Sequence, residues 1–521
     1  MCLWSAGIYF GTGRLVCHKE DKKAGPLCWK IVDLPRSTPL TRRILLVCFV
    51  AALTVMYGIA WLAPAIGLAY RDGALLVMAE TRRFAAAGSD APPLFPALLG
   101  LFALVSRQAR WLKLAPLICS FLWLALTKRL LIKMGASRTC AWTLVLMTAA
   151  SPTVLYLSTG LFAETLFAFL ATACLLALLA ERPLIAGLCA GLATITMSAG
   201  ATLIVACLLT LVAHHRLRIA TVFTGAAMVF AAPWLGWVLA HGGVPAWKLH
   251  LSEMAVLLGS NVSLLAAGPF TLLTGYATWY PGPLTAVALL IVLVRRRQFV
   301  PDLFIGLYCL ALLWRTEPPL YAMAPVLPLL LWMLWRVART GRFAAVTKAA
   351  AIAMLAPALW FGAWRVYPAL TSGAVSAGVA AGDSAPDNWY EMEKLFAFIR
   401  AGTPADTVLM ADLDPVFYLN TGRATLRGFV PDNYRNYYAP PGSLVTPDEL
   451  HAVVVRGRVS YVVVTPDRDL PESASYHKAV AAMERGGMLE PVSVPGVSAG
   501  ASGEYRVLRV VATPAVKPGS R

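Results

Sequence analysis

The chain has 521 residues, of which 58% are hydrophobic and 14% charged, and its formal net charge is +18 at pH 7. With a mean hydropathy of +0.66, a water-soluble protein of this length could not bury its apolar surface, so we expect a polytopic α-helical membrane protein. The basic excess does not indicate nucleic-acid binding, because 31 basic and 11 acidic residues precede Pro368 whereas 14 and 16 follow. Basic residues between apolar spans are typical of cytoplasmic loops.

Residues 1–43 are predicted to be a cytoplasmic tail. They lack a basic leader followed by an apolar core, so the span at 44–66 is expected to be an uncleaved anchor. The basic residues Arg42 and Arg43 directly before this span place the N-terminus inside the cell.

A transmembrane domain is predicted over 44–367, with about eleven spans of apolar residues. The predicted spans are 44–66, 111–131, 139–157, 161–180, 184–198, 200–213, 217–240, 281–295, 300–314, 319–336 and 346–367. Nearly all the connections assigned to the inside are basic, as the positive-inside rule requires. The outside connections are then the long segment 67–110, a short turn near Ser158, the segment 241–280 and residues 315–319.

The first external loop, 67–110, is predicted to contain two short helices at the membrane interface. "GALLVMAETRRFAAAG" spaces its apolar residues as an amphipathic helix does. "PPLFPALLGLFALV", residues 92–105, is too short to span and fits a second interfacial or re-entrant helix. Two such helices would cover a cavity at the outer end of the bundle.

Residues 368–387 are rich in Gly, Ala and Ser and are predicted to be a linker to a small exported α/β domain at 388–521. A helix is expected at 388–404 and strands at 407–413, 461–466 and 505–511. None of the ten cysteines lies in this domain, and the chain has no CxxC or Cys/His cluster. The sequence therefore predicts no metal site, and a divalent cation bound without such a cluster is the alternative.

Asp72, in "YRDGALL" directly after the first span, is the main candidate for catalysis. A carboxylate beside low-dielectric lipid is a stronger base than one in water, and it can accept a proton from an attacking hydroxyl group. The alternative is that Asp72 is a solvated loop residue or the N-cap of the first interfacial helix.

"YRDGALLVMAE" and "PPLFPALLGLF" resemble the first external loop of the glycosyltransferase C superfamily, in particular the branch of protein O-mannosyltransferases and aminoarabinose transferase. "SPTVLYLSTGLFAETLFAFL", "AGLCAGLATIT", "RTEPPLYAMAPVLPLLL" and the start of the C-terminal domain are similar to later segments of that branch. The likeness covers most of the chain from residue 44 onward. The chain departs from the pattern at Gly73, where many relatives have a second acidic residue, and at Met197, where relatives often have an arginine.

The resemblance implies transfer of a sugar from a polyprenyl-phosphate donor to an acceptor at the outer face of the inner (plasma) membrane, with Asp72 as the general base. Arg315 would bind the donor phosphate, with Arg71 and Lys248 as further cations; Arg315 could instead anchor its span at the interface. Glu164 would bind the acceptor or a cation, or pair structurally with an arginine. Tyr321 would line the donor groove or pack in the core. The acceptor could be a glycan, a lipid or a protein.

Two other functions compete with this interpretation. A transporter or flippase of lipid-linked sugars would carry ionisable residues near the middle of the membrane and show internal repeats, and neither is clear here. A non-catalytic membrane protein with an exported glycan-binding domain would need neither an acid after the first span nor the arginine of "LLWRTEPP". Asn261-Val-Ser263 is an N-glycosylation sequon in a predicted external segment.

Overall fold

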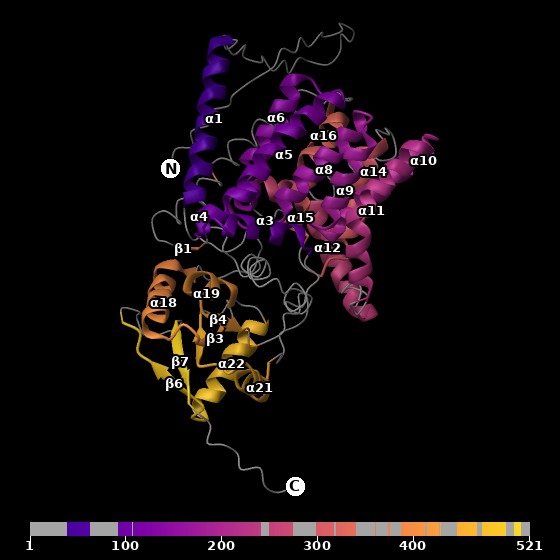
Figure 1. Cartoon of the computed structure of the whole chain (residues 1–521). Coiled ribbons are helices and arrows are strands. Elements are labelled where there is room, and N and C mark those ends of the chain that lie inside the picture. The colour runs from indigo at the N-terminus through magenta and orange to yellow at the C-terminus, as the bar shows by residue number, and fades with distance from the viewer. Residues whose placement is uncertain are drawn as a thin grey trace, which may run out of the picture.

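In the computed structural model the described residues are 39–62, 92–106, 108–240, 249–274, 299–316, 319–339, 360, 374–375, 387–411, 414–426, 428, 445–465, 471–495 and 505–511. They form a helical bundle, drawn from indigo to salmon in Figure 1, and an α/β domain, drawn in orange and yellow. The α/β domain lies beside the end of the bundle that carries α3, α4 and α15 (Figure 1).

The described part of the bundle is built from apolar helices. Its longer helices are α1 (Pro39–Leu62), α5 (Leu114–Lys133), α6 (Arg138–Ala150), α8 (Glu164–Leu179), α9 (Pro183–Thr194), α10 (Ala201–Ala213), α11 (Leu217–Ala240), α12 (Leu251–Thr274), α14 (Phe299–Leu312) and α16 (Leu327–Arg339). Its shorter elements are α3 (Leu94–Ala103), α4 (Ala109–Leu112), α7 (Pro152–Thr159), η1 (Ser198–Gly200), α15 (Leu320–Met323) and η3 (Ala324–Val326).

Three stretches of the described residues are long and apolar enough to cross a membrane: Arg110–Lys133, Leu217–Ala240 and Leu251–Pro269. The pair α6 and α7 makes a fourth if it is taken as one span, bent by 67° at its break. The chain is thus a helix-rich protein with membrane-spanning helices. The predicted total of eleven spans stays a prediction, because two of the predicted spans fall largely outside the described residues.

The break between α6 and α7 has a local cause at Ser151 and Pro152. Proline has no backbone N–H and is favoured in the first turn of a helix, so α6 ends and α7 begins here. The Ser151 hydroxyl accepts a hydrogen bond from the Val154 amide at 3.2 Å and donates one to the Leu272 carbonyl of α12 at 2.6 Å. One side chain therefore caps α7 and holds α12 against the bend.

Close packing of α9 on α11 depends on two glycines. A Cβ atom added at Gly187 would collide with the Phe223 carbonyl, and one at Gly191 with the Ala227 carbonyl. The two backbones approach so closely that only glycine fits, as is common where helices associate in membranes. These glycines belong to the "AGLCAGLATIT" segment singled out in the sequence.

The prediction that 241–280 is an external connection is wrong for 251–274, which forms α12. Polar residues in this segment find hydrogen-bond partners within the protein. Glu253 accepts a hydrogen bond from the His250 amide at the helix start, and Asn261 donates to backbone carbonyls of the segment after α14. Ser263 bonds back to the Ser260 carbonyl.

The C-terminal domain has a five-stranded sheet of order β4-β3-β5-β7-β6. Strand β3 pairs in parallel with β4 and β5, whereas β7 pairs antiparallel with β5 and β6. Its strands are β3 (Val408–Ala411), β4 (Ala424–Leu426), β5 (Tyr461–Val464), β6 (Leu489–Val492) and β7 (Arg506–Val510), and its helices are α18 (Trp389–Gly402), α19 (Asp414–Thr421), α21 (Pro447–Gly457) and α22 (Pro471–Arg485). A two-stranded antiparallel pair, β1 (Ala374–Val375) and β2 (Asp387–Asn388), precedes it.

Buried valines and leucines fill the space between this sheet and helices α21 and α22. The Tyr476 hydroxyl of α22 donates to the Val463 carbonyl of β5 at 3.2 Å. Helix α21 starts with a reciprocal capping box, in which Thr446 and Glu449 each bond the backbone amide of the other. The domain therefore has a hydrophobic core of its own, and its helix α21 has a start that the local sequence specifies.

Candidate functional site

Glu164 is the first residue of α8, and only 4% of its surface is exposed. A buried carboxylate is costly unless it is paired or stabilised by dipoles, and the amino end of a helix supplies such a dipole. The position follows from the sequence, because the turn "GLFA" separates α7 from α8 and leaves Glu164 to open the new helix. A carboxyl group is thus buried at the start of a bundle helix.

Arg315 lies in the short connection between α14 and α15. Its backbone amide bonds to the Leu312 carbonyl at 3.2 Å, which tightens the last turn of α14. The Asn261 amide of α12 donates to the Arg315 carbonyl at 2.9 Å. The guanidinium group therefore projects from a backbone that is fixed on two sides.

Tyr308 connects the parts of the molecule that hold these two charged residues. Its ring stacks on Phe167 of α8, with centroids 5.4 Å apart and planes inclined by 14°. Its hydroxyl donates to the Ala322 carbonyl of α15 at 2.7 Å. Glu164 and Arg315 both act electrostatically on Tyr308. The structure thus brings Glu164 and Arg315, which are 151 positions apart in the sequence, to the same part of the bundle.

Tyr321 belongs to a group of three aromatic rings next to these residues. Its ring centroid lies 5.9 Å from that of Tyr156 and 6.3 Å from that of Phe162, and the last two are 4.9 Å apart. Phe162 is two residues before Glu164 and Tyr321 is six after Arg315. Tyr156 and Tyr321 are half-buried, whereas Phe162 is buried. The three rings form an aromatic surface on the segments that carry Glu164 and Arg315.

Lys113 was not predicted from the sequence, although its side chain is fully buried. It precedes α5, and Ser120 of α5, about two helical turns further on, hydrogen-bonds Ser158 at the end of α7 at 2.7 Å. Helix α5 therefore contacts, at Ser120, the segment that leads into Glu164. An ionisable residue within an apolar span is a sequence signal for a functional residue. In Lys113 this signal is weak, because the residue stands at the edge of the predicted span 111–131.

Asp72, Arg71 and Lys248 lie outside the described residues, and so does the first predicted interfacial helix. The second, predicted at 92–105, corresponds to α3, whose Leu94 amide donates to the Ile195 carbonyl after α9 at 3.0 Å. Among the described residues there is no group of three or more His, Cys, Asp or Glu side chains that could hold a metal ion.

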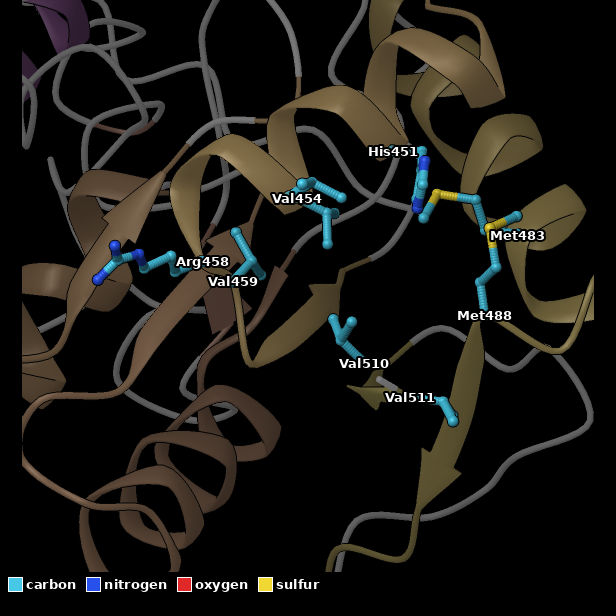
Figure 2. Close-up of a pocket in the computed structure, with 9 residues that line it drawn as sticks. His451, Val454, Arg458, Val459, Met483, Met488, Val510 and Val511 are labelled. Carbon is cyan, nitrogen blue, oxygen red and sulfur yellow. The ribbon is translucent and has the colours of Figure 1, made fainter. Parts of the chain in front are cut away.

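A cavity of about 160 Å³ lies in the α/β domain rather than in the bundle, between α21, the end of α22 and β7 (Figure 2). It is lined mainly by valines and methionines, with His451 beside Met483 and the Arg458 side chain directed away from them (Figure 2). None of the residues predicted to carry the chemistry lines this cavity. The bundle residues around Glu164 therefore remain the candidate site.

The fold is similar to that of ArnT from Cupriavidus metallidurans bound to undecaprenyl phosphate. The TM-score is 0.54 at 13% sequence identity, over 90% of this chain and 98% of that chain. The apo structure of the same protein gives a TM-score of 0.48 at 12% identity, over 91% and 99% of the two chains. The arabinofuranosyltransferase AftD from Mycobacteria gives 0.41 at 17% identity, over 91% of this chain and 40% of that one.

The likeness to ArnT extends over almost the whole of both chains, so the two proteins share a fold. The fold that the sequence resemblance implies is therefore confirmed. No protein-family model matches the chain, and no curated protein matches its sequence.

Proposed function

We propose that this chain, which has the fold of ArnT, transfers a sugar from a polyprenyl-phosphate donor to an acceptor at the outer, periplasmic face of the membrane. The observation that carries the proposal is that the buried Glu164 and Arg315 both lie within electrostatic range of Tyr308 in such a fold. The ArnT structure of that fold was determined with undecaprenyl phosphate bound. A lipid of this kind approaches sideways through the bilayer, whereas a polar acceptor arrives from water.

Asp72 is the proposed general base. Its carboxylate takes the proton from an acceptor hydroxyl group, and the resulting oxygen attacks the anomeric carbon of the donor sugar. The bond from that carbon to the phosphate oxygen breaks on the opposite side, so the configuration inverts. The polyprenyl phosphate leaves with the bonding electron pair. The transferred group is a hexose or pentose.

Cations are needed where negative charge develops on the departing phosphate. Arg315 is the first candidate, because its fork of N–H donors matches a phosphate and its backbone is fixed by Asn261. Arg71 and Lys248 are further candidates from the predicted external segments. The buried Lys113, at the start of α5, adds a fourth.

Glu164 is proposed to bind the acceptor, or a cation that accompanies the donor. It is buried at a helix start, where its carboxyl group has a fixed origin, as positioning of an acceptor hydroxyl requires. Tyr321, with Tyr156 and Phe162, is proposed to form the wall of the donor groove. Aromatic rings suit both the isoprenoid chain and the apolar face of a sugar.

The test is mass spectrometry of envelope glycans and lipids in a deletion strain that is complemented with wild type, Asp72→Asn or Glu181→Gln. Glu181 is a matched control, because it forms an exposed pair with Arg216 away from the site. The deletion is expected to lose one sugar increment, which wild type and Glu181→Gln restore and Asp72→Asn does not, at equal membrane levels.

Full rescue by Asp72→Asn would remove Asp72 from the mechanism and favour a non-catalytic glycan-binding protein. Loss of a lipid-linked sugar from the outer leaflet, with its accumulation inside, would favour a flippase instead.

A further inference from the structure

The last carbonyls of α14, from Cys309 to Leu312, accept hydrogen bonds from the amides of the next three residues, Leu313 to Arg315. The carbonyls of Leu313 and Arg315 lie beyond this last turn, in the segment that leads out of the helix. Water is scarce beside an apolar helix in a membrane protein, so a side-chain donor from elsewhere in the chain stabilises carbonyls at such a position.

Asn261 of α12 supplies that donor. Its side-chain amide lies 3.0 Å from the Leu313 carbonyl and 2.9 Å from the Arg315 carbonyl, with the Leu312 carbonyl at 3.5 Å. Asn261 is fully buried. An asparagine amide carries two N–H donors, and here they serve the two residues on either side of Trp314. A buried asparagine of this kind is no acceptor for glycosylation, despite the sequon.

The same helix also fixes the far side of the connection. A Cβ atom added at Gly268 of α12 would collide with the Met323 side chain of α15, so α12 and α15 are in close contact there. The Tyr308 hydroxyl closes the connection by binding the Ala322 carbonyl at 2.7 Å. Arg315 thus lies in a segment held at both ends, and the Asn261 amide bonds directly to the Arg315 carbonyl.

We propose that Asn261 is a positioning residue for Arg315: its amide fixes the 313–315 backbone so that the guanidinium is aimed at the donor phosphate. The proposal rests on the function proposed above, since it assumes that Arg315 binds that phosphate. Asn261 itself touches neither sugar nor phosphate. Its contribution is to fix the backbone from which the guanidinium group extends.

The variants are Asn261→Ala, Asn261→Asp and Asn261→Gln, each made in the wild-type chain. Asn261→Ala is also combined with Arg315→Ala in a double variant. Alanine removes the donors, and aspartate places a carboxylate against carbonyl oxygens. Glutamine keeps the amide on a side chain one methylene longer. Asn420→Ala is the matched control, because Asn420 makes a comparable side-chain bond to the Val416 carbonyl in the α/β domain. Ser263→Ala removes the sequon and leaves Asn261 in place.

The first measurement is the dissociation constant for undecaprenyl phosphate, with the full chain in nanodiscs. We expect Asn261→Ala to weaken binding about tenfold, as loss of one well-placed hydrogen bond does. Asn261→Asp is expected to weaken it at least as much, and Asn261→Gln to recover part of the affinity. In the Arg315→Ala background, Asn261→Ala should not weaken the binding of undecaprenyl phosphate any further, because Asn261 acts on binding only through Arg315. Both controls should bind as wild type does.

The second measurement is hydrogen exchange of residues 312–316 without ligand, which we expect to accelerate in Asn261→Ala and not in Ser263→Ala. The proposal is overturned if this exchange is unchanged, or if Asn261→Ala weakens binding equally in the presence and absence of Arg315. Failure of the proposed function is distinguishable: wild type would then not bind undecaprenyl phosphate, or Arg315→Ala would bind it as wild type does.

Discussion

The ring of Tyr308 lies on the ring of Phe167, with centroids 5.4 Å apart and planes inclined by 14°. This contact joins α14, which leads to Arg315, to α8, which begins at Glu164. Both rings are fully buried. The relative position of the two charged residues therefore depends on a stacked aromatic pair that lies within the bundle core.

Replacement of Phe167 by alanine is expected to destabilise the bundle by about 3–5 kcal/mol, because it removes a large buried ring and leaves a cavity. The measurement is unfolding by SDS titration in mixed micelles. Phe121→Ala is the control, since Phe121 is 55% exposed and belongs to the neighbouring helix α5. Equal losses in the two variants would contradict a specific role for the stacked pair.

Much of the fold could be predicted from apolar segment lengths and turn residues. The predicted helix 388–404 corresponds to α18, and the predicted strands at 407–413, 461–466 and 505–511 contain β3, β5 and β7. These elements have strong local signals. Helix α12 differs from the prediction because Asn261 finds its partners on the distant segment after α14 and Ser263 bonds within the helix. Hydropathy along the chain does not register such partners.

Asp302 of α14 and Arg336 of α16 form a buried ion pair at 2.8 Å, with side chains 6% and 11% exposed. Asp302→Asn leaves the guanidinium without its charge partner, and such a loss costs about 3–5 kcal/mol. We expect low membrane levels and early SDS unfolding. The double variant Asp302→Leu with Arg336→Leu should recover most of the stability, because two apolar residues leave no buried charge.

The exposed pair of Glu181 and Arg216, at 2.9 Å, is the natural comparison. Glu181→Gln should change stability by less than about 1 kcal/mol. If it were as damaging as Asp302→Asn, burial would not be the reason for the effect.

One glycine of α9 and one of α11 give a prediction in which two Gly→Ala substitutions change stability in opposite directions. Gly191→Ala places a methyl group on the Ala227 carbonyl of α11 and should destabilise by about 1–3 kcal/mol. Gly225→Ala, on α11, meets nothing within 4 Å and should stabilise its helix by about 0.5–1 kcal/mol. Thermal unfolding monitored by tryptophan fluorescence compares the two. A gain in Gly191→Ala would refute the close approach of α9 and α11.

The candidate site was less predictable than the fold. Glu164 and Arg315 were identified because a charge at the end of an apolar segment is unusual, and the structure brings them together through Tyr308. The contacts of Asn261 could not be inferred, since they depend on which carbonyls are left over after α14 ends. Lys113 had a local signal, but its complete burial depends on neighbouring segments.

Arginine and lysine differ in shape more than in charge, so replacing Arg315 by lysine tests how the donor phosphate is bound. Arg315→Lys keeps the charge and loses the fork of donors, and we expect binding of undecaprenyl phosphate to weaken about tenfold. Arg315→Ala should weaken it about a hundredfold. Arg216→Ala, an exposed arginine in the connection after α10, is the control. Wild-type affinity in Arg315→Ala would refute a phosphate contact.

The predicted orientation can be tested with single cysteines in a background in which the ten native cysteines are replaced. A membrane-impermeant maleimide should label Asp72→Cys in intact cells, because position 72 follows an inside-to-outside span. It should also label His250→Cys, which precedes α12, if this helix enters from the outer side. Glu181→Cys, in the basic turn between α8 and α9, should react only after permeabilisation. Labelling of position 181 but not of position 72 in intact cells would show that the true topology is the reverse of the predicted one. A general base at position 72 would then face the cytoplasm, away from any acceptor in the periplasm.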